Sequence, residues 1–175
     1  RYRNDWGAFA TYNMGLGASD RFALTGEVRE RRYPTGPLRS RTRDIAEVTG
    51  IWTHSLANGK TSLSLGGSIA QEWATQERVD GDASIWSIRS SLDHSFSNSL
   101  DAFFFLEYWE EGYDEERPDF SADPGILVQR NDDLLYAGGG LVWTFAPGWT
   151  LRPTFEYDWE DSNVPALAYS KTEVW

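Results

Sequence analysis

The sequence predicts an all-β chain that folds as an antiparallel, up-and-down transmembrane β-barrel. The first observation is the alternation of residues 149–160, in which odd positions from 149 to 159 are apolar or aromatic and even positions are polar or charged. The second is that this apolar set begins at Trp149 and ends at Trp159. The third is that short and long connections alternate along the chain. Strands that cross a bilayer in a barrel show these features, because one face meets lipid, the other meets water, and aromatic side chains gather at both interfaces.

Composition excludes several classes of protein. The chain of 175 residues has a mean hydropathy of -0.53, and no apolar run approaches the length of about 20 residues that a membrane helix needs. A barrel stays possible, because its water-facing residues dilute the average. The chain has no cysteine, so disulfides and thiolate metal sites are excluded. The net charge of -11 argues against a nucleic-acid partner and is compatible with cationic cargo. Residues 1–5 do not resemble a signal peptide.

Period-two alternation predicts nine strands, and helical periodicity is weak throughout. The expected ranges are 6–14, 21–33, 43–56, 61–77, 83–96, 99–114, 132–146, 148–160 and 168–175. Each of the six segments from 21–33 to 132–146 has one face that is mostly apolar. In chain order, these faces include Phe22, Leu24 and Val28; Ala46, Val48 and Trp52; Leu63, Leu65 and Ile69; Trp86, Ile88 and Leu92; Leu100, Phe104 and Leu106; Leu135, Leu141 and Trp143. Residues 43–56 are less regular, because Ile51 falls on the polar side.

The connections divide into two sets. Short turns are expected at 15–20, 57–60, 97–98 and 147–148, and longer links at 34–42, 78–82, 115–131 and 161–167. The first set includes Asn58-Gly59, a two-residue hairpin signal. Barrels of the bacterial outer membrane have short periplasmic turns and longer external loops, so the two sets are assigned in that way.

This assignment predicts two belts of lipid-facing aromatic residues. The outer belt contains Trp6, Trp73, Trp86, Tyr108, Tyr157 and Trp159, and the inner belt contains Tyr12, Trp52, Phe96, Trp143, Phe145 and Trp149. The assignment also makes the first strand run inward, whereas bacterial barrels begin and end in the periplasm. We therefore expect residues 1–175 to be one barrel domain that lacks at least one N-terminal strand and ends abruptly at Trp175, so that the full barrel has ten or more strands.

The aromatic-belted pattern resembles Gram-negative outer-membrane β-barrel proteins along the whole chain. A narrower resemblance lies in residues 151–175, where Asp161-Ser162-Asn163-Val164-Pro165 precedes a step through Tyr169 into the last strand. This segment is similar to the closing hairpin of barrels linked to tetratricopeptide repeats, such as the surface lipoprotein assembly modifiers. The resemblance implies a translocation barrel that moves lipoproteins to the cell surface. The chain departs from that pattern, because it has no repeat domain and does not end in Phe.

The polar faces predict a charged lumen. The lumen-facing charges are Glu27, Arg29, Glu47, Glu72, Arg89, Asp93, Asp101, Glu107, Arg152, Glu156 and Asp158. They either set selectivity in a water-filled channel or form ion pairs that fill a narrow barrel. Ten strands favour a filled barrel, and fourteen or more favour a channel.

Other candidate chemistry has a structural interpretation beside the functional one. His54 and His94 lie on the lipid-facing register, whereas a catalytic histidine needs a nucleophile and a carboxylate on the polar side. Two clusters of charged residues, one acidic and one basic, each allow two interpretations. Glu107, Glu110, Glu111, Asp114, Glu115, Glu116, Asp119 and Asp123 form either a cation site or a solvated loop; Arg29, Arg31, Arg32, Arg39, Arg41 and Arg43 form either a lipopolysaccharide contact or an ordinary rim.

We expect an outer-membrane transport conduit, either a diffusion channel or an export pore, with a net acidic lumen. The alternative is a scaffold barrel whose filled interior holds a partner, and an outer-membrane hydrolase is less favoured. No enzymatic activity, cofactor or metal is predicted. The expected partners are outer-membrane lipid, lipopolysaccharide and a periplasmic or surface protein.

Gly138-Gly139-Gly140 lacks the residues of a phosphate loop and indicates a bend or close approach, and Pro153 removes a ladder hydrogen bond.

Overall fold

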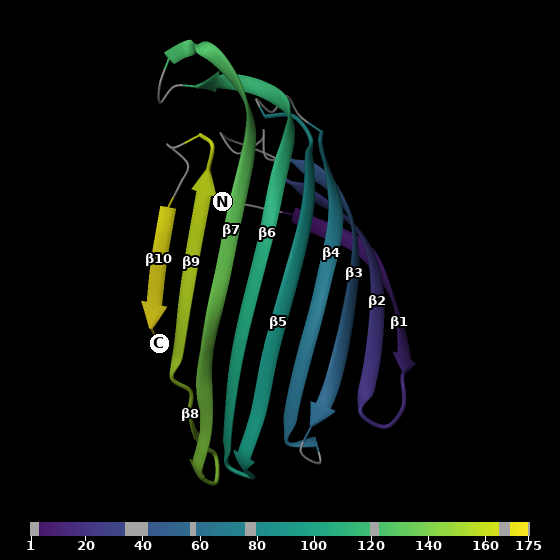
Figure 1. Ribbon diagram of the computed structural model, residues 1–175, viewed down its shortest axis with the longest axis vertical. Helices are drawn as coiled ribbons and strands as arrows, with labels where there is room; N and C mark the ends of the chain where they lie inside the picture. The colour runs from purple at the N-terminus through teal and green to yellow at the C-terminus, as the bar shows by residue number, and fades with distance from the viewer. Residues whose placement is uncertain are drawn as a thin grey trace.

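The structure, a computed structural model, describes residues 4–33, 42–56, 59–75, 80–119, 123–164 and 169–174. These residues form one sheet of ten strands (Figure 1). The strands are β1 (Asn4–Gly15), β2 (Asp20–Arg32), β3 (Arg43–Leu56), β4 (Thr61–Ala74), β5 (Ala83–Ser97), β6 (Leu100–Asp119), β7 (Asp123–Ala146), β8 (Trp149–Leu151), β9 (Thr154–Ser162) and β10 (Tyr169–Val174).

The sheet is antiparallel and open. Its order is β1-β2-β3-β4-β5-β6-β7-β9-β10, with β8 paired to β7 beside this path. The prediction of a closed barrel therefore differs from the sheet that the described residues form, which has β1 and β10 as its two edges (Figure 1). The physical reason lies in strand direction. Eight antiparallel steps separate β1 from β10, so these two strands run in the same direction and cannot form an antiparallel seam with each other.

Two predicted elements are corrected. The link expected at 115–131 is mostly strand, because the β6–β7 register resumes at Glu116 and Gln129 after an irregularity that begins at Gly112. The two strands thus extend beyond their neighbours and bend over at one end of the sheet (Figure 1). The strand expected at 148–160 is divided into β8 and β9 at Pro153. Proline cannot donate to the ladder, although its carbonyl still accepts a hydrogen bond from the Leu141 amide at 3.1 Å.

One end of the sheet, which we call the turn end, holds the short connections 16–19, 57–60, 98–99 and 147–148. At the last of these, Gly148 has a positive φ of 77°, which suits a tight turn. At the opposite end, which we call the loop end, β2 and β4 end and β3 and β5 begin. This alternation of short and long connections agrees with the sequence prediction, except at the extended β6–β7 hairpin.

The hairpins are staggered in a regular way. Arg21, the last residue of β2 that pairs with β1 at the turn end, opposes Thr53, and β3 continues three residues farther to Leu56. The same offset occurs at the next two hairpins. The β5–β6 hairpin extends from His94, which opposes Thr61, to Ser97. The β7–β8 hairpin extends from Trp143, which opposes Leu100, to Ala146. The second and third offsets each include a one-residue register shift. Each hairpin therefore reaches two to three residues beyond the hairpin before it.

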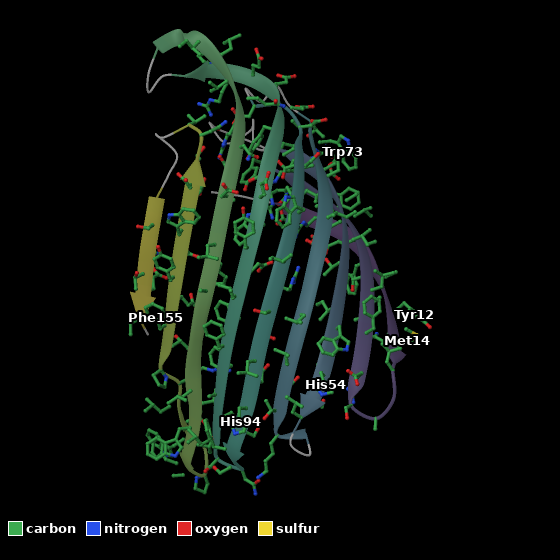
Figure 2. All side chains as sticks on the ribbon, in the orientation of Figure 1. Tyr12, Met14, His54, Trp73, His94 and Phe155 are labelled. Carbon is green, nitrogen blue, oxygen red and sulfur yellow. The ribbon has the colours of Figure 1, made fainter. Side chains whose placement is uncertain are left out.

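The two faces of the sheet differ in crowding. Buried strand residues such as Ile45, Ser68, Glu72, Ala83 and Asp132 all lie on one face, whereas most exposed large apolar side chains lie on the other. Side chains converge on the inner side of a curved sheet and spread apart on its outer side. We therefore identify the crowded face as the inner one. Figure 2 shows Tyr12 and Met14, from the less crowded face, projecting away from the sheet beside β1.

Candidate functional site

The crowded face contains the residues that the sequence predicts for a lumen. Directly opposed residues of an antiparallel pair share a face, so the register can be followed from strand to strand. Glu27 opposes Glu47, Ile45 opposes Glu72, and Arg89 opposes Glu107, all on this face. The register also places Arg29, Asp93, Asp101, Glu156 and Asp158 there, and Arg152 reaches the same face from the link between β8 and β9. We call this surface the polar face.

The twelve predicted interface aromatics all lie on the opposite side, which we call the apolar face. The register connects Trp6, Tyr12, Trp52, Trp73, Trp86, Phe96, Tyr108, Trp143, Phe145, Trp149, Tyr157 and Trp159 through directly opposed or same-face neighbours. Several of them contact one another. The ring centroids of Trp86 and Tyr108 are 5.5 Å apart, and those of Trp143 and Phe145 are 5.4 Å apart. Trp73 lies toward the loop end of the sheet (Figure 2).

The middle of the apolar face is exposed. Leu65, Phe104, Leu141 and Phe155 are 42–50% exposed, although each lies within a long hydrogen-bonded strand. A hollow of about 890 Å³ crosses β1 to β5, where small residues such as Ala8 and Ala46 lie between Val28, Val48 and Trp86. No described element covers this face. It is an extended apolar surface that needs an apolar neighbour.

The charges on the polar face are only partly paired. Arg43 forms an ion pair of 2.6 Å with buried Glu72, and longer pairs join Arg29 to Glu27 at 3.7 Å and Arg89 to Glu107 at 3.8 Å. Glu47 accepts a hydrogen bond from Thr49. Within the described part of the chain, Asp93 and Asp101 have no hydrogen-bond or ion-pair partner, and both are exposed. The pairing therefore becomes sparser toward the turn end of β5 and β6.

A network of buried ion pairs lies at the loop end of the polar face. Arg130 contacts Asp132, lies 3.2 Å from Asp80 and 3.7 Å from Glu160, and places its guanidinium 4.6 Å from the ring centroid of Tyr113. Arg117 also binds Asp80, at 3.0 Å. Asp132 is fully buried and accepts a hydrogen bond of 2.6 Å from Ser162. The network connects the extended β6–β7 hairpin to the β4–β5 link and to β9.

Sequence reasoning missed most of this network. Asp80, Arg117 and Arg130 were placed in links, so no face could be assigned to them. The signal that could have found them is the run Ile126-Leu127-Val128, which favours a strand and places Arg130 and Asp132 on one face.

Glu111 extends the same network toward β3 and β4. Burial raises the pKa of this carboxyl, and the negative charge of Glu72 raises it further, while a hydrogen bond with Tyr113 acts in the opposite direction. Glu111 opposes Asp132 on the polar face, beyond Trp86 and Tyr108 toward the loop end. The pKa of Glu111 is therefore raised above its ordinary value by burial and by the neighbouring carboxylates at the loop end.

Aromatic rings also lie on the polar face, along β6 and β7. Phe105 packs over Gly138 and Phe103 packs over Gly140, because a Cβ at these glycines would lie only 2.5 Å and 3.0 Å from the respective ring Cζ atoms. The Phe105 and Tyr136 ring centroids are 4.9 Å apart. Gly138 and Gly140 therefore permit close approach of flat rings, as the sequence predicts for glycine in a strand.

The two histidines lie near the turn end of the apolar face (Figure 2). The Nδ1 atom of His54 is 2.8 Å from Asp20, which also accepts a hydrogen bond of 2.9 Å from Trp52 Nε1. The Nδ1 atom of His94 is 2.7 Å from the Thr61 hydroxyl. His54 thus has a carboxylate neighbour and His94 a hydroxyl neighbour. The register turns Ser55, Asp93 and Ser95 to the polar face.

The two charged clusters are distributed differently from what their sequences suggest. Glu107 and Glu111 lie on the polar face of β6, whereas Glu110 lies on the apolar face and accepts a hydrogen bond of 3.1 Å from Trp86 Nε1. No group of three or more acidic or imidazole side chains among the described residues is arranged to hold a metal ion.

In the basic cluster, Arg31 pairs with Asp5 at 3.4 Å and Arg32 with Asp44 at 3.3 Å. Arg39 and Arg41 lie outside the described residues, as do the side chains of Asp119 and Asp123.

The segment 161–164 attaches the end of β9 to β7. Asn163 donates a hydrogen bond of 2.7 Å to the Gln129 carbonyl and accepts one of 2.9 Å from the Asn131 amide. The side chain of Val164 is buried beside this contact. The residues that carry the narrower resemblance therefore stabilise the loop end locally, and Pro165 lies outside the described residues.

No protein-family model, curated protein or solved structure matches this chain. The described residues include no helix that is long and apolar enough to span a membrane.

Proposed function

We propose that the sheet is part of the wall of a bacterial outer-membrane β-barrel, and that its polar face lines a water-filled passage for polar or cationic solutes. The observation that carries this proposal is the exposed apolar face, with Leu65, Phe104, Leu141 and Phe155 opposite a charged face. In water such a face would drive aggregation, whereas lipid tails satisfy it.

The stagger of the hairpins supports a barrel. An offset of two to three residues corresponds to roughly 7–10 Å along the strands, and each hairpin spans two strand spacings, or about 9.6 Å. If the turns lie at one level of the membrane, the strands tilt by about 35–45° from the barrel axis. This is the range in which strands tilt in closed barrels.

The same tilt accounts for the two aromatic belts. One row of opposed residues connects Tyr12 of the predicted inner belt to Trp159 of the predicted outer belt; it passes through Leu24, Gly50, Gly67, Ile88, Tyr108 and Leu135. Seven strand spacings cover about 34 Å. At a tilt of about 40° this row rises by about 22 Å, close to the height of about 25 Å for the apolar band of such barrels.

The predicted lumen charges favour cations. They comprise eight carboxylates and three arginines, giving a net charge of -5 if all are ionised. A passage with an excess of carboxylates raises the local concentration of cations and sets its selectivity.

Antiparallel closure of the cylinder requires an odd number of further strands between β1 and β10, because these edges run in the same direction.

A second candidate function is a scaffold barrel with a filled interior. Two observations favour it: the ion-pair network around Arg130 and the rings of Phe103 and Phe105 both occupy space on the polar face. An export pore for lipoproteins, implied by the resemblance of residues 151–175, is a variant of the conduit with a larger cargo.

Conductance in a planar bilayer separates these functions. A solute channel gives discrete open steps with a preference for cations, and replacing Glu107 and Asp158 by Gln and Asn reduces that preference. A filled scaffold gives no steps with any salt. Absence of insertion into vesicles of outer-membrane lipid and lipopolysaccharide would reject the membrane assignment as a whole.

A further inference from the structure

We propose that the turn end of the polar face binds a small organic monocation of the guanidinium type, between Asp93, Asp101 and the ring of Phe103. The inference deepens the proposed function, on which it rests for the passage of the ligand. Binding itself can be measured apart from transport.

The site is a hollow of about 280 Å³ at the turn end of β5 and β6. On the polar face it is lined by Asp93, Ser95, Asp101, Phe103, Val142 and Arg152. Pockets for drug-sized ligands begin near 300 Å³. The hollow therefore suits a ligand with few non-hydrogen atoms.

The charge of the hollow favours a single positive charge. Asp93 opposes Phe103 and Ser95 opposes Asp101, so the two carboxylates are diagonal neighbours, which in antiparallel sheets lie about 7–8 Å apart. Neither carboxylate has a hydrogen-bond or ion-pair partner within the described part of the chain. With Arg152, the ionised hollow carries a net charge of -1, which one bound cation neutralises.

The ring of Phe103 already has a guanidinium above it. The Arg152 guanidinium carbon lies 6.0 Å from the ring centroid, at the outer limit of a cation–π contact. Arg152 is exposed and has no carboxylate partner among the described residues, so this contact is weak. The ring itself is held against Gly140, where a Cβ would lie 3.0 Å from its Cζ atom.

A second contact of this kind occurs at the loop end, where Arg130 lies 4.6 Å from the ring centroid of Tyr113 and binds three carboxylates. The protein therefore contains a complete example of a guanidinium held by a ring and acids. The hollow at Phe103 has the same chemical parts, but its carboxylates are free to bind a ligand.

The test compares ethylguanidinium with its neutral isostere ethylurea, by calorimetric titration of the folded protein in detergent micelles. Ethylguanidinium is expected to bind saturably, and ethylurea at least about tenfold more weakly, because only the cation gains the carboxylates and the ring. Equal binding of the two compounds would overturn the proposal, as would no binding of either.

Variants locate the site. Phe103→Leu is expected to weaken binding about fivefold, and Asp93→Asn with Asp101→Asn about tenfold or more. Phe9→Leu, on the polar face of β1, and Asp161→Asn, at an exposed position of β9, change the same residue types away from the hollow and should leave binding unchanged. Arg152→Gln should strengthen binding, because it removes the competing guanidinium, and misfolding could not produce a gain. Equal losses in the target and control variants, or weaker binding by Arg152→Gln, would contradict the assignment.

The outcome is separate from that of the conductance experiment. Saturable binding without open steps supports the cation site and rejects the conduit. Open steps without binding support the conduit and reject the site.

Discussion

The ring of Phe105 lies directly over Gly138, so that a Cβ added to the glycine would be 2.5 Å from Cζ of the ring. The same Cβ would be 2.7 Å from the Phe155 carbonyl oxygen, which belongs to the backbone and cannot easily move. Gly138→Ala is therefore expected to destabilise the protein by about 1–3 kcal/mol, the usual cost of overpacking. Urea unfolding in detergent micelles measures this change.

The matched control for Gly138→Ala is Gly26→Ala. No atom lies within 4 Å of a Cβ placed at Gly26, which is also in the middle of a strand. This variant should be neutral or more stable by about 0.4–1 kcal/mol, because alanine restricts the unfolded chain. Equal destabilisation by the two variants would contradict the packing of Phe105 on Gly138.

Removal of the Asp132 carboxylate should strongly destabilise the loop end. Asp132 is fully buried between Arg130 and Ser162, and Asp132→Ala leaves a half-buried guanidinium without its nearest carboxylate. The expected loss in the free energy of unfolding is about 3 kcal/mol. Asp161→Ala, at an exposed neighbouring position, should change it by less than about 0.5 kcal/mol. A loss at Asp132 no larger than that at Asp161 would show that the network does not stabilise the fold.

The raised pKa of Glu111 predicts a pH dependence of stability. The folded state binds this proton more tightly than the unfolded state, so the contribution of Glu111 to stability decreases as pH rises from the ordinary pKa of 4.5 through the raised folded value. Glu111→Gln should remove this decrease and become relatively more stable toward neutral pH. Unfolding free energies measured between about pH 4 and about pH 8 test the difference. Glu116→Gln, at an exposed position on the same strand, is the control; an unchanged slope in Glu111→Gln would disprove the assignment.

A charge in the middle of the apolar face should be costly in lipid. Phe104→Lys places an ammonium at an exposed position of that face and is expected to destabilise the protein in lipid vesicles by about 2–4 kcal/mol. Ser91→Lys, on the polar face of the adjacent strand, should cost less than about 1 kcal/mol, because its ammonium reaches water. The opposite order of the two costs would mean that the faces are assigned the wrong way round.

The assignment of faces could be predicted from sequence, because a strand has a side-chain period of two. Once Trp86 and Leu92 define one face of β5, Arg89 and Asp93 must lie on the other, and the face agrees for the predicted interface and lumen residues of the strands; Arg152, between β8 and β9, is placed by its contact with the Phe103 ring. Ile51 also lies on the polar face, as the sequence predicts, opposite Gly66. The roles proposed for these residues remain predictions.

Long-range relationships could not be predicted in this way. Arg130 binds Asp80 across 50 positions of sequence, and both lie in segments that the polar composition marks as links. The common direction of the two edge strands could be predicted, because nine up-and-down strands place the first and the last in the same direction. The aromatic residues of β6 were visible in the sequence, but the close approach of Phe103 and Phe105 to glycine depends on the β6–β7 register.

Spin-label accessibility along residues 100–106 of β6 tests the central claim most directly. The chain has no cysteine, so single-cysteine variants can be labelled without background. In lipid vesicles, even positions such as 104 should be accessible to oxygen, which concentrates in lipid, and odd positions such as 103 to a water-soluble nickel chelate, with a period of two. Even positions shielded from both reagents, or an absence of alternation, would contradict a sheet with one face in lipid and the other in water.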